Sequence, residues 1–167
     1  ALASLIYLGE QENDEIQQDV ARSLANITAN EENHVPAFEQ GALNCLVALT
    51  NSSDEVCQRY AAMGLRFLSS NAMVRVEIVR QGLLQPFLHL AQSPILDFQR
   101  TAGAAFSSFS LNQANKSRLV KEGALAQILS CMRYKDLEVQ RDCAFALANI
   151  ADSVEYQNDV VREGGLE

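Results

Sequence analysis

Apolar residues recur at helical spacing along most of the chain. The clearest segment is 138–151, whose apolar positions stand at i, i+4, i+5, i+8 and i+11: Val139, Cys143, Ala144, Leu147 and Ile150. This spacing places them on one face of an α-helix. A polar loop such as residues 51–54 precedes helices of this kind and offers side chains that cap a first turn. The pattern predicts an all-α chain.

Two shorter helical segments precede each long one. Residues 71–81 show the first, with Val74, Ile78 and Val79 on its apolar face. Residues 124–132 show the second, with buried positions at Leu125, Ile128 and Leu129. A glycine separates the two segments, and glycine readily adopts the left-handed conformation that ends a helix. Each unit is therefore predicted to hold three helices.

The same unit recurs as a 41-residue repeat without insertion or deletion. Glycine, glutamine and leucine keep this step in separate columns: Gly41, Gly82, Gly123 and Gly164; Gln17, Gln58, Gln99 and Gln140; Leu2, Leu43, Leu84, Leu125 and Leu166. A column of small residues, Ala21, Ala62, Gly103 and Ala144, predicts close approach of neighbouring long helices. We expect the glutamines to bond loop backbone between repeats. No unit could bury its apolar face alone, so the units must stack.

The long helix carries a motif that resembles the armadillo repeat. The run Gln-Arg-x-x-Ala-x-x-Leu-x-Asn-Ile is present at residues 140–150, and a close variant lies at 17–27. The resemblance covers the whole chain and implies a right-handed α-solenoid of three-helix repeats. HEAT repeats have two helices and lack the glycine turn. The expected organisation is one domain: a partial repeat at 1–29, repeats at 30–70, 71–111 and 112–152, and a partial repeat at 153–167.

In the family, third helices line a concave groove and an asparagine on each holds the backbone of an extended peptide. A carboxamide suits this task because it both donates and accepts hydrogen bonds. The corresponding column here is Asn26, Phe67, Ser108 and Asn149. One turn earlier the column is Arg22, Met63, Ala104 and Phe145, where importin-α places tryptophan to hold lysine side chains. The chain contains no tryptophan, so we do not expect it to bind basic nuclear-localisation signals.

The middle of the predicted groove combines aromatic, apolar and basic side chains. Tyr60, Met63 and Phe67 are flanked by Arg59, Arg66 and Arg100. Such a surface suits an acidic, amphipathic segment of a partner protein. Three structural interpretations stay open: Phe67 lies in the core, the arginines form salt bridges to adjacent helices, and Asn26 and Asn149 bond backbone groups between repeats.

The chain has a net charge of −8, and its charged residues are unevenly distributed. Residues 1–55 carry ten acids and one base, 56–121 two acids and eight bases, and 122–167 nine acids and four bases. The acidic total argues against nucleic acid or an anionic membrane as the main partner. No apolar run approaches the roughly 20 residues of a membrane helix, and no secretory signal is expected.

The sequence offers no chemistry for catalysis or metal binding. The four cysteines form no CxxC pair and are expected to be small core residues of a reduced, cytoplasmic protein, with the nucleus or an organelle surface as other locations. His34 and His89 lack ligand spacing, so neither a metal nor another cofactor is expected. No P-loop, nucleophile elbow or dinucleotide fingerprint is present.

These features predict a non-enzymatic scaffold or adaptor that binds an extended protein segment. Two alternatives remain open: an assembly module that uses the repeat ends or convex face, and a targeting domain of a larger enzyme. The first residue is Ala1, and neither end shows a polar capping repeat. We therefore expect a fragment of a longer chain that self-associates through its ends.

Overall fold

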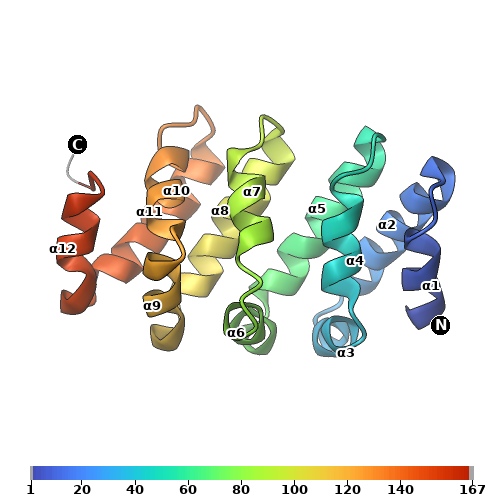
Figure 1. The fold of residues 1–167 in the computed structure, drawn as a ribbon, viewed down its shortest axis with the longest axis horizontal. Helices are drawn as coiled ribbons and strands as arrows, with labels where there is room; N and C mark the ends of the chain where they lie inside the picture. Colours follow the sequence, from blue (N-terminus) through green and yellow to red (C-terminus); the bar gives the residue numbers. More distant parts are fainter. Residues whose placement is uncertain (1, 166–167) are drawn as a thin grey trace. The chain divides into compact units, whose positions relative to one another are not determined.

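A computed structural model describes residues 2–165 of the chain. These residues form α-helices and one short 3₁₀ helix, and no strand is present among them (Figure 1). The all-α solenoid prediction is thereby confirmed. The chain divides into two compact units, Ala1–Val74 and Arg75–Glu167.

The first unit contains the helices of the partial repeat and of the first complete repeat. They are α1 (Leu2–Gly9), α2 (Asp14–Thr28), η1 (Glu31–Asn33), α3 (His34–Glu39), α4 (Ala42–Leu49) and α5 (Glu55–Ser70). The long helices α2 and α5 pack against each other, and α4 packs against both. Leu24, Leu46 and Leu65 lie fully buried among them.

Helix α6 (Ala72–Arg80) crosses the boundary between the units. The second unit then contains α7 (Gln85–Gln92), α8 (Leu96–Ser110), α9 (Gln113–Lys121), α10 (Ala124–Cys131), α11 (Leu137–Ala151) and α12 (Val154–Arg162). Its long helices α8 and α11 lie side by side (Figure 1). The buried rings of Phe87 and Phe109 meet edge to face, with centroids 5.2 Å apart.

The four glycines of the repeat column adopt the left-handed backbone conformation that the sequence predicts. Gly41, Gly82, Gly123 and Gly164 all have positive φ, between 74° and 93°. Helices α4 and α10 begin directly after Gly41 and Gly123. Helix α7 begins three residues after Gly82, where Pro86 fixes the backbone of its first turn.

Loop side chains cap three of the four long helices. The carboxylate of Asp54 accepts a hydrogen bond from the Cys57 amide at 2.6 Å, and Asp136 does the same for Val139 at 3.0 Å. Asn13 caps α2 in the same way. Ile95 stands at the equivalent position of α8 and offers no side-chain cap.

Each glutamine of the Gln column holds the loop before its own long helix. Their Nε2 atoms donate to carbonyl oxygens six residues earlier at 2.7–2.9 Å: Gln17 to Gln11, Gln58 to Ser52, Gln99 to Ser93 and Gln140 to Tyr134. We expected these bonds between repeats. The structure corrects this expectation, because each bond stays within one repeat and fixes the turn between its second and third helices.

The small residues Ala21, Ala62 and Gly103 of the predicted column are buried, whereas Ala144, the fourth, is exposed. A Cβ on Gly103 would lie 3.6 Å from the Cβ of Asp142 and 3.7 Å from the Cα of Val139. Helices α8 and α11 thus approach closely at Gly103. Leu166, the last member of the leucine column, lies outside the described residues.

Candidate functional site

The predicted site residues of the first unit lie on the two long helices α2 and α5. Arg22 and Asn26 are exposed on α2, one helical turn apart. Arg22 pairs with Asp19 at 2.5 Å on the same exposed surface. Asn26 is exposed, so its carboxamide is accessible to solvent.

Helix α5 presents a half-buried row beside them. Tyr60, Met63 and Phe67 are spaced three and four residues apart, so they follow one face of α5, and each remains partly accessible. Phe67 is therefore not fully buried. Arg59 is exposed and Arg66 half-buried on the same helix. We name the surface of Arg22, Asn26, Tyr60, Met63 and Phe67 the α2–α5 surface.

In the second unit, Arg100 and Ser108 are used within the fold. The Arg100 guanidinium binds both carboxylate oxygens of Asp136, at 2.7 and 3.3 Å, and lies 3.4 Å from Glu138. It thereby ties α8 to the start of α11, so the salt-bridge reading holds for this arginine. We exclude Arg100 from the candidate surface.

The structure corrects the prediction that Ser108 lines the groove. Its side chain is only 8% exposed, and its hydroxyl accepts a hydrogen bond from Arg75 of α6 at 3.3 Å. The arginine reaches it from the first helix of the same repeat, an interaction that periodicity on the third helix alone does not reveal. Ser108 therefore offers no surface to a partner.

Phe145 and Asn149 remain partly available on α11. Phe145 is 47% exposed. The Nδ2 of Asn149 donates to the hydroxyl oxygen of Ser110 in α8 at 3.0 Å, so this asparagine bonds a side chain of the preceding repeat rather than its backbone. Within the described residues this is its one side-chain hydrogen bond, which leaves a second Nδ2 hydrogen and Oδ1 for a ligand.

The cysteines behave as core residues. All four are buried and unpaired. Burial raises the pKa of Cys45 to about 11, with a further increase from Glu10 and Cys57, and burial is also the main cause that raises the pKa of Cys57. Both stay protonated at neutral pH, which does not suit a nucleophile.

Metal-binding clusters and membrane-spanning helices are not found in the described part of the chain. No three His, Cys, Asp or Glu side chains within residues 2–165 are grouped to hold a metal ion. None of the helices over the same range combines the length and apolar character needed to cross a membrane.

The Arg100–Asp136 pair predicts a pH dependence of stability. The hydrogen bonds from Arg100, and then that from the Val139 amide, hold the pKa of Asp136 below its usual range. A carboxyl group whose pKa is lower in the folded than in the unfolded chain stabilises the fold at pH values above its unfolded pKa, about 3.9. This stabilisation is lost as pH falls through the folded-state pKa. Asp136→Asn keeps a capping acceptor but removes the charge. We expect this variant to unfold at a lower urea concentration than the wild type at pH 7.

The difference between the two proteins should shrink toward zero as pH falls below the Asp136 pKa, because the wild-type carboxyl is then also neutral. Urea midpoints measured at pH 7, 5 and 3 test this. A difference that stays constant over this range would show that the charge pair is not its cause.

The comparisons with known proteins agree with this architecture. A family model described as Armadillo/beta-catenin-like repeat matches residues 112–152. An engineered protein of known crystal structure has a TM-score of 0.84 at 28% sequence identity, over 99% of this chain and 70% of its own. A computationally designed armadillo repeat protein for modular peptide recognition has a TM-score of 0.89 at 25% identity, over 99% of this chain and 71% of its own. No curated protein matches the chain significantly.

The matched residues 112–152 contain α9, α10 and α11 with the Gly123 turn between the first two, which is the three-helix unit that the repeat period predicts. The structural likeness extends over both units of the chain. Residues 112–152 therefore match an armadillo repeat, and the fold of the chain is similar to that of designed armadillo repeat proteins.

Proposed function

We propose that this chain is a protein-binding scaffold that holds an extended segment of a partner on the α2–α5 surface. The observation that carries the proposal is the accessible row of Tyr60, Met63 and Phe67 beside the solvent-facing carboxamide of Asn26. Large side chains of this kind dominate the binding energy of protein interfaces. The carboxamide complements them because it pairs with both groups of a peptide unit.

The proposed partner segment is acidic and amphipathic. Arg59 and Arg66 lie on the same helix as the apolar row, and Arg22 lies on the neighbouring helix. An extended segment that alternates apolar and acidic residues would place apolar side chains on Met63 and Phe67 and carboxylates near the guanidinium groups. A second asparagine, Asn149, supports a similar role for α11 in the second unit. No catalytic step is proposed.

Peptide arrays test both the surface and the charge preference. We would compare extended peptides that alternate leucine or phenylalanine with aspartate or glutamate against the same peptides with lysine. The wild type should prefer the acidic set. Met63→Glu should weaken binding about tenfold or more, because it places a charge in the centre of the apolar row.

Met73→Glu is the matched control. Met73 lies on a different helix, α6, and is 67% exposed, so the same substitution there changes the charge equally without entering the row and should leave binding unchanged. Preference for the lysine set, or equal binding by the two variants, would overturn the proposal for this surface.

Self-association is a second candidate, supported by apolar side chains on α12. Val154 and Val161 of this helix are 79% and 52% exposed. Sedimentation measured over a range of protein concentrations tests it. An association that Val161→Glu abolishes would favour contact through this helix, and a monomer at every concentration would exclude it.

A further inference from the structure

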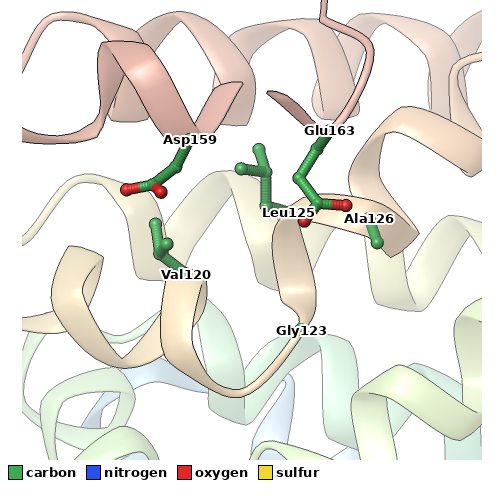
Figure 2. A pocket seen from close by; sticks show the side chains of 6 residues that line it. All are labelled: Val120, Gly123, Leu125, Ala126, Asp159 and Glu163. Atoms are coloured by element: carbon green, nitrogen blue, oxygen red, sulfur yellow. The ribbon is translucent and has the colours of Figure 1, made fainter. Parts of the chain in front are cut away.

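A pocket of about 140 Å³ lies in the second unit where α12 passes the turn between α9 and α10 (Figure 2). Val120, Leu125 and Ala126 supply apolar lining. Asp159 of α12 and the exposed Glu163 that follows this helix also line the pocket, and their carboxylates lie on either side of the Leu125 side chain in Figure 2. None of these residues belongs to the surfaces of the long helices discussed above.

The equivalent place one repeat earlier contains an arginine. Arg118 stands exactly one repeat period before Asp159, and its Nη1 donates a hydrogen bond to the carbonyl oxygen of Val79 at 3.0 Å. The same Nη1 is the neighbour nearest to a Cβ built on Gly82, at 4.0 Å. Val79 and Gly82 precede Val120 and Gly123 by the same period. The guanidinium of Arg118 therefore fills the position that is open as the pocket.

The acidic side of the pocket also has its counterpart. Glu122, which occupies the repeat position of Glu163, lies 3.7 Å from the Nη1 of Arg118. In the earlier repeat one carboxylate thus faces one guanidinium. In the pocket, Asp159 replaces that guanidinium, so two carboxylates face an unfilled space.

The existing partners of these groups do not fill the pocket. Asp159 pairs with Arg162 at 3.1 Å, but Arg162 is one turn further along the same helix and its side chain is 73% exposed, so the pair contributes little. The carbonyl oxygen of Val120 accepts the Gly123 amide at a long 3.4 Å. A carbonyl oxygen has two lone pairs, and the equivalent Val79 oxygen uses its second for Arg118.

We propose that this pocket receives the guanidinium of an arginine presented by a partner protein. The planar N–H donors of a guanidinium group could bind the two carboxylates and the Val120 carbonyl oxygen. In the preceding repeat, Arg118 interacts with one carboxylate and one carbonyl oxygen in this way. The aliphatic stem of the arginine would lie along Val120, Leu125 and Ala126. A water molecule takes about 30 Å³ of liquid, so the pocket has room for the four heavy atoms of a guanidinium group. This site is independent of the α2–α5 surface.

The test uses N-acetyl-arginine methylamide as the probe and N-acetyl-lysine methylamide as its comparison. Each is titrated into the ¹⁵N-labelled chain, and the amide resonances of Gly123, Leu125 and Ala126 are followed. The arginine probe should shift these resonances and bind about tenfold more tightly than the lysine probe, because an ammonium group is a point charge without the planar fork.

Two substitutions of aspartate by arginine separate the pocket from general charge. Asp159→Arg places an arginine where the preceding repeat has Arg118, so it should fill the pocket and abolish the shifts while the chain stays folded. Asp152→Arg changes the net charge equally at an exposed position after α11, and it should leave the titration unchanged.

The proposal is overturned if no resonance near Gly123 moves, if the two probes bind equally, or if the two variants respond alike. Met63→Glu should not alter the arginine titration. The pocket and the α2–α5 surface can therefore fail separately.

Discussion

Phe109→Ala is expected to lower the free energy of unfolding by about 3–5 kcal/mol, because it removes a fully buried aromatic ring from the core. Phe109 is 0% exposed on α8, and its ring meets that of Phe87 edge to face at an interplanar angle of 88°. The substitution removes both the buried area and this ring contact, and the packed helices α7 and α8 cannot close the space without moving.

Phe145→Ala is the matched control on the neighbouring long helix. Its ring is 47% exposed, so the same substitution should cost less than about 1 kcal/mol. Urea unfolding followed by circular dichroism measures both. Repeat proteins can unfold in parts, so hydrogen exchange of the α8 amides should accompany it. Equal costs for the two variants would contradict the assignment of Phe109 to the core and Phe145 to the surface.

The fold was accessible from the sequence because its determinants are local and repeated. A glycine at each first turn, a capping aspartate or asparagine before most long helices, and a glutamine that holds its own loop all act within a few residues of their position. The regular repeat period displays each of them several times. The destination of the glutamine bonds was predicted wrongly, because sequence periodicity does not separate a loop inside a repeat from one between repeats.

The candidate site was less accessible because its residues depend on side chains from other elements. Ser108 was assigned to the groove, but Arg75 of α6 reaches its hydroxyl. Arg100 was assigned to a partner, but Asp136 and Glu138 of the next repeat bind it. These contacts join residues more than thirty positions apart, and their geometry is not periodic.

The acidic pocket left a signal in the sequence that we did not use. The alignment of the repeats places Asp159 in the column of Arg118, a reversal of charge between the first helices of two successive units. The reversal became interpretable only once the structure showed that Arg118 contacts the backbone of the preceding repeat. Departures from a repeat pattern therefore carry as much information as its agreements.

Gly123→Val is expected to lower the free energy of unfolding by about 1–3 kcal/mol through the backbone alone. Gly123 has φ 86° and ψ 11°, in the left-handed region, and a Cβ built on it meets nothing within 4 Å. Because no neighbour obstructs a side chain, the cost comes from the clash of a β-branched residue with its own backbone. Gly123→Asn should cost less, since asparagine tolerates this conformation.

Gly103→Ala is the control, because it shows what replacing a glycine costs where the backbone is not in the left-handed conformation. Gly103 lies within α8, and an added Cβ would meet its neighbours at 3.6 Å, an ordinary contact distance. Alanine favours a helix by about 0.5–1 kcal/mol over glycine, so Gly103→Ala should be neutral or stabilising. Thermal melting of the three variants ranks them.

A valine variant as stable as the asparagine variant would refute the conformational explanation of Gly123. Gly41 provides a second trial in the other unit, because it has φ 90° and equally open surroundings. The same ranking at both positions would show that the glycine column is retained for the turn itself, whatever side chains surround it.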